Sequence, residues 1–215
     1  DIIRSAVNRD VDLTPSDPIV WGLDVARFGG DNSALCVRQG NTVLSIESFE
    51  SMDLMQLCGV IKNKYDECVA MERPQEVLVD VIGLGSGVVD RLRELNMPVR
   101  GINVAESPST KKTYLNLRAE LWFKIKDWFI QRDCKIPDDD EFVNELASPG
   151  YKYTSSGKIK IESKEEMRKR GIKSPDKADA FALTMASGVA SYGGGDSFMG
   201  YNFKKPLKSK IYRVG

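Results

Sequence analysis

The 215-residue sequence contains no histidine. Catalysis by a Ser-His-Asp or Cys-His arrangement is therefore excluded, as is a metal site built from imidazole groups. Carboxylates remain as the natural metal ligands, and they favour hard ions such as magnesium or manganese. Cysteine is scarce as well. The four cysteines include no pair at CxxC spacing, so they indicate buried free thiols rather than a zinc knuckle or a disulfide framework.

Long apolar runs are also missing. No stretch is long enough to cross a bilayer, and the first ten residues, DIIRSAVNRD, are too charged for a signal peptide. We therefore expect a protein that stays in a cytosol and has no membrane partner. Because the sequence does not begin with Met, we also expect it to be a fragment of something larger.

Length and composition predict one globular domain. A chain of this size with 41% hydrophobic residues can bury a sizeable core. We place the domain at residues 18–190, after a polar lead-in at residues 1–17 and before a flexible tail at residues 191–215. The net charge is zero, but the tail beyond Asp196 is basic. Its charged residues are Lys204, Lys205, Lys208, Lys210 and Arg213.

One acidic residue follows an apolar run near the start of this domain. Residues 19–23, IVWGL, predict a buried strand, and Asp24 comes directly after them. A buried carboxylate is costly without a partner, so Asp24 is either a hydrogen-bonded cap or a ligand for a cation. The next turn contains Gly29 and Gly30, which allow a substrate to approach Asp24 closely.

A second acidic residue lies near the end of another apolar strand. Alternation predicts an antiparallel hairpin at residues 34–49, so the first three strands form a meander. A helix capped by Asp53 then runs to near Met71. The next apolar segment, EVLVDV at residues 76–81, predicts a strand that places Asp80 close to its C-terminal end.

Glycines follow this strand in the segment IGLGSGV, residues 82–88. They indicate either a dinucleotide-binding turn or a steric role. The spacing does not match GxGxxG, and no acidic residue follows at the end of a second parallel strand, which disfavours the first interpretation. Small residues here allow a helix that begins near Ser86 to start directly beside Asp80, and allow a nucleic-acid backbone to pass over them.

The middle of the chain predicts a short strand at residues 98–103, an exposed basic loop at residues 107–113 and a long amphipathic helix at residues 114–132. On that helix, Arg118 lies away from the apolar face, either as a phosphate contact or as part of a solvated face. The acidic run PDDDE, residues 137–141, resembles a metal site at first sight. A helix cap with an acidic first turn explains it better, because anions favour helix N-termini.

Basic residues gather near the end of the domain. Residues 151–161 alternate around Ser-Ser-Gly and predict a hairpin, which a basic loop follows. This hairpin and loop form either a DNA-binding surface or a solvated and partly mobile one. The candidate DNA contacts are Lys158, Lys160, Arg168, Lys169 and Arg170.

A late helix brings two more acids. Residues 174–190 predict a helix with Ser174 as its cap and Pro175 at its first position. Asp176 and Asp179 are three residues apart, so they share a face and can bind one ion. Alternatively, they only complement the positive end of the helix dipole.

Carboxylates thus come from a first strand, from a neighbouring strand and from a late helix. In element order this set resembles the ribonuclease H-like nuclease superfamily, an α/β fold. The mixed central sheet of that fold combines an antiparallel three-strand meander with parallel strands and is flanked by helices; here an auxiliary β-hairpin is added. Over residues 18–190, the segments WGLDVARFGGD and SPDKADAFALT further resemble the C-terminal nuclease domain of the large terminase subunit of tailed bacteriophages.

The resemblance implies a metal-dependent endonuclease that cuts double-stranded DNA with little sequence specificity, during headful packaging of concatemeric viral genomes. It makes three residues the catalytic ligands of two divalent ions, magnesium or manganese: Asp24, Asp80 and Asp179. Asp176 is then an auxiliary metal ligand, and Asp31 is a candidate for a water-mediated metal contact.

The resemblance also implies partners. Large terminases carry an ATPase domain, but the sequence lacks the phosphate-binding motif GxxxxGK[ST], so it represents the nuclease piece alone. The small terminase subunit and the portal protein are the other implied partners, and the basic tail resembles the portal-docking segment in place and charge. The implied location is the host cytoplasm, with a transient stay at the portal of the viral procapsid.

Two other functions stay open on the sequence. Related folds include actin-like phosphotransferases, which bind ATP with glycine turns such as GLGSG, although no second phosphate loop or adenosine motif is present. A DNA-binding or portal-docking module without catalysis would retain salt-dependent DNA binding but show no metal-dependent cutting.

Overall fold

A five-stranded sheet with the strand order β3-β2-β1-β4-β5 forms the centre of the computed structural model, which describes residues 2–26 and 32–189. β1 pairs antiparallel with β2, and β2 with β3, whereas β4 pairs parallel with both β1 and β5. This is the mixed sheet that the sequence predicts, a meander extended by parallel strands. The strands are β1 (Ile19–Asp24), β2 (Ser33–Gln39), β3 (Thr42–Phe49), β4 (Glu76–Asp80) and β5 (Val99–Ile102).

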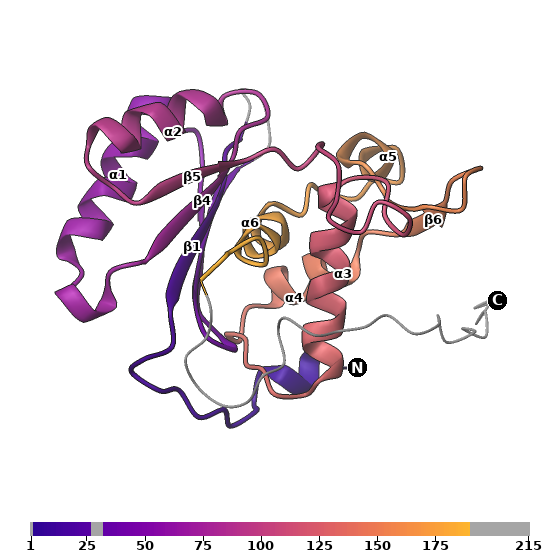
Figure 1. Cartoon of the computed structure of the whole chain (residues 1–215), viewed down its shortest axis with the longest axis horizontal. Coiled ribbons are helices and arrows are strands. Elements are labelled where there is room, and N and C mark those ends of the chain that lie inside the picture. Colours follow the sequence, from indigo (N-terminus) through magenta and orange to yellow (C-terminus); the bar gives the residue numbers. More distant parts are fainter. Residues whose placement is uncertain (1, 27–31, 190–215) are drawn as a thin grey trace.

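Helices cover both faces of the sheet (Figure 1). α1 (Leu54–Glu67) and α2 (Gly85–Glu94) pack on one face, against side chains such as Trp21 and Leu23. α3 (Leu117–Ile130), α4 (Asp140–Ala147) and α6 (Asp176–Thr184) form the core on the other face. Successive side chains of a strand point to opposite faces. Trp21 and Leu23 therefore face α1 and α2, while Gly22 and Asp24 face α6.

Several smaller elements complete the described part of the chain. They are η1 (Arg4–Ala6), η2 (Ala70–Glu72), the hairpin strands β6 (Tyr151–Tyr153) and β7 (Ile159–Ile161), and α5 (Lys164–Lys169). The hairpin forms where the sequence predicts it, and its turn places Gly157 at φ +76°. Within the expected lead-in, Ala6 and Val7 are buried in the core beside α3 and α4. None of the helices in the two described ranges is both long and apolar enough to cross a membrane.

The first helix is shorter than predicted. Asp53 caps α1 and forms a capping box with Gln56, as its place in the sequence predicts, but the helix ends at Glu67 rather than near Met71. Beyond that point Val69 and Met71 are 56% and 78% exposed, so no burial supports a further turn.

Two other predictions are wrong: the start of the helix at residues 114–132, and the loop expected after the hairpin. α3 begins only at Leu117, after its cap Asn116, because the backbone of the preceding residues pairs with β7. In that pairing the Leu115 N–H donates to the Ile159 carbonyl at 2.9 Å. α5 is a helix where the sequence analysis expects a basic loop. Its signal is a capping box between Ser163 and Glu166, residue types that the sequence shows at the right spacing.

Candidate active site

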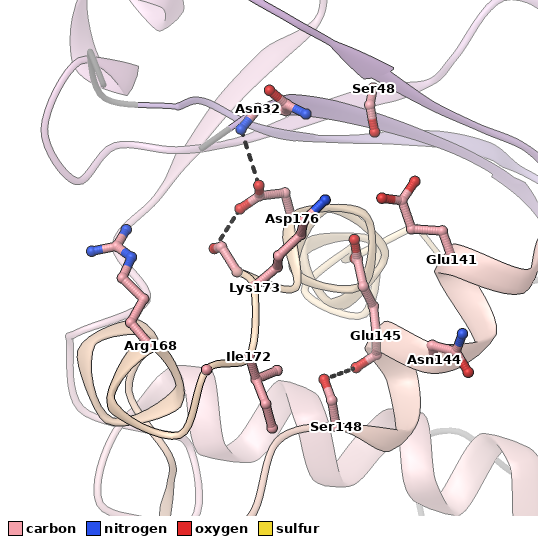
Figure 2. A pocket seen from close by; sticks show the side chains of 12 residues that line it. Asn32, Ser48, Glu141, Asn144, Glu145, Ser148, Arg168, Ile172, Lys173 and Asp176 are labelled. Atoms are coloured by element: carbon pink, nitrogen blue, oxygen red, sulfur yellow. Dashed lines mark hydrogen bonds between the residues drawn. The ribbon is translucent and has the colours of Figure 1, made fainter. Parts of the chain in front are cut away.

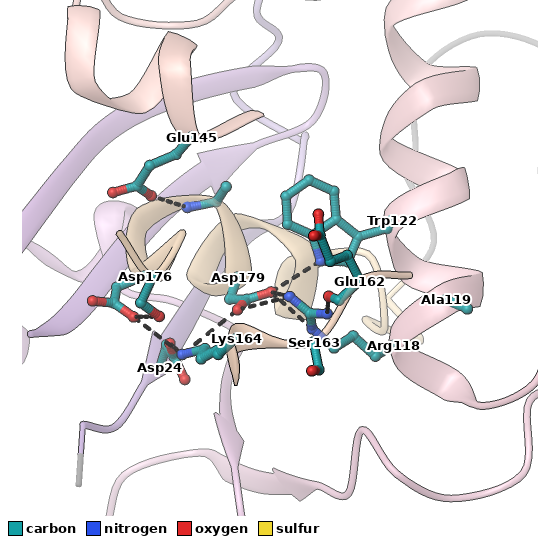
Figure 3. A network of polar contacts seen from close by, with 12 residues as sticks. Asp24, Arg118, Ala119, Trp122, Glu145, Glu162, Ser163, Lys164, Asp176 and Asp179 are labelled. Atoms are coloured by element: carbon teal, nitrogen blue, oxygen red, sulfur yellow. Dashed lines mark hydrogen bonds and ion pairs between the residues drawn. The ribbon is translucent and has the colours of Figure 1, made fainter. Parts of the chain in front are cut away.

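The carboxyl ends of β1 and β4 and the N-terminus of α6 bring acidic residues to one edge of the sheet. Asp24 and Asp80 are the last residues of their strands, and Asp176 and Asp179 lie in the first turn of α6. Figure 3 shows that three of these side chains surround the ammonium group of Lys164, which comes from α5. The structure therefore brings together the acids that the sequence analysis selects. The cation at their centre, Lys164, is not among the residues that the sequence analysis selects.

Lys164 Nζ lies 2.9 Å from Asp24 Oδ2, 3.1 Å from Asp176 Oδ1 and 3.6 Å from Asp179 Oδ2. The three aspartates are 5%, 7% and 9% exposed, so these contacts are largely removed from solvent. Buried charges need partners to offset their desolvation. We call these four residues the Lys164 cluster.

Burial and charge compete in setting the ionisation of the cluster. Burial raises the pKa of Asp24 to about 7; Lys164 opposes this rise, and the other two aspartates reinforce it. Burial disfavours the charged form of Lys164, but the surrounding carboxylates raise its pKa well above the ordinary value. Lys164 is therefore an ammonium ion at neutral pH and compensates part of the negative charge of the cluster.

Asp179 has two further partners on α3. Arg118 donates to Asp179 Oδ1 from Nη2 at 3.0 Å, and the Trp122 indole N–H donates to the same oxygen at 2.9 Å. Burial alone raises the pKa of Asp179, but the charges of Arg118 and Lys164, with the indole hydrogen bond, bring it below its ordinary value. Both sequence interpretations of Arg118 are wrong, because its side chain is only 16% exposed and is paired with Asp179, so it is neither part of a solvated face nor turned outward to contact a phosphate.

Asp80 borders the cluster. Its Oδ1 accepts a hydrogen bond from the backbone N–H of Ile82 at 3.0 Å. Burial raises the pKa of Asp80, the backbone hydrogen bond lowers it, and the charges of Asp179 and Lys164 also act on it. Asp80 is thus close enough to share the electrostatic field of the cluster from the neighbouring strand.

Two glycines allow these elements to approach each other. A Cβ atom at Gly22 would lie 2.0 Å from the Ala180 carbonyl oxygen, so glycine permits the contact between β1 and α6. A Cβ atom at Gly85 would lie 1.6 Å from the Asp80 carbonyl oxygen. The steric interpretation of the IGLGSGV segment is therefore confirmed, because this glycine lets α2 start directly beside Asp80.

Both predicted ends of α6 are wrong. Ser174 Oγ donates to Asp176 Oδ1 at 2.6 Å and so orients a carboxylate, while Pro175 is the residue that caps the helix. At the other end, Arg38 donates to the carbonyl and to the hydroxyl of Thr184, both at 2.9 Å. The helix ends at Thr184 rather than at residue 190, and its terminal carbonyl accepts from this guanidinium and from the Ser187 N–H.

The donor chemistry of the cluster fits a hard divalent ion, because every group that faces Lys164 is a carboxylate. In the part of the chain that the structure describes, no three acidic or cysteine side chains are placed to hold a metal ion as they stand. Lys164 explains this, since its ammonium group occupies the point on which the carboxylates converge. A metal ion at this point would have to take the place of the ammonium group.

A cavity of about 670 Å³ adjoins the cluster at Asp176 (Figure 2). α4 lines one side of it with Glu145, whose carboxylate accepts a hydrogen bond from the Ala178 N–H at 2.9 Å. Burial raises the pKa of Glu145 to about 8. Arg168 lines the same cavity from α5, and Lys173 lines it from the connection between α5 and α6.

The other predicted sites are placed as follows. Asp139 caps α4 by accepting from the Phe142 N–H, and Lys177 pairs with Asp139 and Glu141, so the cap interpretation of residues 137–141 is confirmed. Lys160 lies 3.6 Å from Glu166.

Among the other candidate DNA contacts, Arg170 Nε lies 2.8 Å from Glu162 Oε1. Binding of DNA by the hairpin and α5 stays a prediction. Asp31 and the basic tail lie outside the described residues.

Sequence reasoning missed the positive partners of the acids. Lys164 is 140 residues from Asp24 in the chain, and no local pattern links the two. The only signal was the capping box that starts α5 and thereby fixes where Lys164 lies. Arg118 and Trp122 lie in a helix that the sequence predicts, but the sequence does not specify which element packs against it.

No family model matches the chain, and no curated protein does. Solved structures do match it. The nuclease domain of the large terminase subunit gp2 of bacterial virus Sf6 has a TM-score of 0.73 and 18% identity, over 87% of this chain and 97% of that one. A mutant of that domain with manganese has a TM-score of 0.73 and 17% identity, over 86% and 96%.

The large terminase nuclease from thermophilic phage G20c with bound magnesium also matches, with a TM-score of 0.63 and 16% identity over 86% of this chain and 94% of that one. At these identities the likeness establishes the fold. The chain has the ribonuclease H-like fold of phage terminase nuclease domains.

Proposed function

We propose that this chain is a metal-dependent endonuclease for double-stranded DNA, the nuclease part of a phage large terminase subunit. One observation carries the proposal: the buried carboxylates of Asp24, Asp176 and Asp179 converge on one partly buried cation, Lys164, at the edge of the sheet where β4 ends in Asp80. The fold shared with the Sf6 and G20c nuclease domains supports it.

Asp24, Asp80 and Asp179 would hold two divalent ions, magnesium or manganese, with Asp176 as an auxiliary ligand. Such ions supply an activated water and stabilise the leaving oxygen when a phosphodiester is hydrolysed. Asp24 is the best candidate to contact both ions, because it ends β1, with Asp80 on the adjacent strand β4 and the two aspartates of α6 on its other side. The Sf6 structure with manganese and the G20c structure with magnesium support divalent metal use in this fold.

The chain's own residues prepare this chemistry. Lys164 compensates part of the negative charge of the aspartates before a metal binds, which limits the repulsion among buried carboxylates. Gly22 and Gly85 allow the backbone contacts that bring the acids to one place. The chain therefore contributes a preorganised set of oxygen ligands.

DNA would lie along the hairpin and α5, whose first residue is Lys164. Basic side chains there would hold phosphates without reading base sequence, and this suits cutting of concatemeric genomes in headful packaging. The candidate contacts are Lys158, Lys160, Arg168, Lys169 and Arg170. The partners in this proposal are the terminase ATPase domain, the small terminase subunit and the portal protein, met in the host cytoplasm and at the procapsid portal.

Cleavage of supercoiled plasmid tests the proposal. The chain is incubated with magnesium, manganese or EDTA, beside Asp24→Asn and the matched control Asp138→Asn, whose exposed side chain lies in the PDDDE segment. We expect metal-dependent cutting at many unrelated sites by the wild type and the control, and at least a hundredfold slower cutting by Asp24→Asn. Plasmid that stays intact with every metal, although the chain binds it, would overturn the nuclease proposal in favour of a DNA-binding module.

A further inference from the structure

Arg118 and Trp122 contact one carboxylate of the Lys164 cluster from the side opposite Lys164 (Figure 3). Asp179 Oδ1 accepts three hydrogen bonds: from Arg118 Nε at 3.2 Å, from Arg118 Nη2 at 3.0 Å and from Trp122 Nε1 at 2.9 Å. Oδ2 accepts one, from Arg118 Nη2 at 3.2 Å, and lies 3.6 Å from Lys164 Nζ. The two oxygens of Asp179 therefore have different surroundings.

Further contacts fix the positions of Arg118 and Trp122, the two side chains that donate to Oδ1. Arg118 Nη1 donates to the Glu162 carbonyl at 2.8 Å, and the guanidinium lies 5.7 Å from the centre of the Trp122 ring. Both side chains come from α3, one turn apart, and Trp122 is 7% exposed. A planar guanidinium fixed at three points leaves its carboxylate partner little freedom to rotate.

We propose that Arg118 and Trp122 are positioning residues that hold Asp179 Oδ1 so that Asp179 offers Oδ2 to a bound divalent cation. This inference rests on the proposed metal-dependent function. It adds that Asp179 is presented as a ligand through one oxygen, and that α3 sets its direction. Groups that orient a metal ligand from outside commonly change metal affinity tenfold to a hundredfold when they are replaced.

Binding of Mn²⁺ to the whole chain without DNA, measured by calorimetry, tests the inference. Trp122→Phe removes the indole donor, and Arg118→Lys removes the paired guanidinium donors Nε and Nη2. Neither substitution changes the charge near the site. We expect each to weaken Mn²⁺ binding about tenfold. In cleavage assays, the manganese concentration for half-maximal rate should rise by the same factor, with a smaller change in the rate at saturation.

Trp128→Phe is the matched control. Trp128 is buried in the same helix and donates its indole N–H to Asn41 at 3.1 Å, away from the cluster. It should bind Mn²⁺ like the wild type. Normal Mn²⁺ affinity in both test variants, or an equal loss in Trp128→Phe, would overturn the positioning role.

The folded state of each variant is checked by unfolding in EDTA, and if Arg118→Lys does not fold, Trp122→Phe decides. A wild-type chain that binds no Mn²⁺ would overturn the metal site itself and the positioning role with it. A wild type that binds Mn²⁺ but does not cut DNA would count against the proposed function alone, because the affinity comparison still stands.

Discussion

At the scale of single residues, Lys164 is the cation that compensates the carboxylates of the site while no metal ion is bound. Lys164 touches Asp24 and Asp176 and lies near Asp179, so it compensates carboxylates that burial would otherwise make costly. The same carboxylates are the ligands proposed for a divalent ion. Lys164 and the metal therefore compete for one set of oxygens. Lys164 stabilises the metal-free protein, but it weakens the binding of the metal.

Lys164→Gln should destabilise the metal-free chain by about 3 kcal/mol, because it leaves buried carboxylates without their cation. Manganese should then stabilise this variant more than it stabilises the wild type, since the ion meets no competing ammonium group. Both effects are measured by urea unfolding, in EDTA and in manganese. Lys152→Gln is the control: its side chain is 60% exposed and pairs with Glu166, so it should cost at most about 1 kcal/mol. Unchanged stability of Lys164→Gln in EDTA would contradict this view of the cluster.

Glu145 makes stability depend on pH. Its pKa is raised by burial from 4.5 to about 8, so the folded chain keeps a proton that the unfolded chain releases. Stability therefore falls as pH rises from about 4.5 to about 8, because over that window Glu145 ionises in the unfolded chain but not in the folded one. Glu145→Gln should gain stability relative to the wild type over that window, by about 2 to 4 kcal/mol between its ends. Urea unfolding in EDTA across the window measures this, and a stability difference that does not change with pH would disprove it.

At the scale of elements, the site depends on how closely α6 lies on β1. The distance is set by Gly22, where any side chain would collide with the Ala180 carbonyl oxygen, and α6 is tied down at its end by Arg38. Because β1 carries Asp24 and α6 carries the other two aspartates, this helix-to-strand contact determines whether the acids meet. The contact serves function as well as stability.

Gly22→Ala should therefore cost at least about 2 kcal/mol of unfolding free energy, because the backbone carbonyl it meets cannot move aside cheaply. It should also weaken Mn²⁺ binding, since α6 must shift away from Asp24. Gly59→Ala is the control, because Gly59 lies inside α1 with open space around it and alanine favours a helix by about 1 kcal/mol. Equal stability of Gly22→Ala and the wild type would show that α6 does not need this close approach.

At the scale of the whole molecule, the sequence predicts the strands and their order better than it predicts side-chain contacts between distant segments. Asp24 and Asp80 could be selected because a carboxylate at the end of an apolar strand needs a partner, and the meander follows from alternation around short turns. The positive partners could not be predicted, because Lys164 and Arg118 reach the site through packing between distant segments. Helix limits were wrong where contacts with distant segments occur at the helix end, as Arg38 does at Thr184.

If the acids around Lys164 form a divalent metal site, diffraction from crystals soaked in manganese will locate the ion there. An anomalous difference map should show manganese among the carboxylates of Asp24, Asp80 and Asp179, with the ammonium group of Lys164 moved off the point where it now lies. Manganese that binds only elsewhere, while Lys164 stays between Asp24 and Asp176, would show that these acids do not form the metal site.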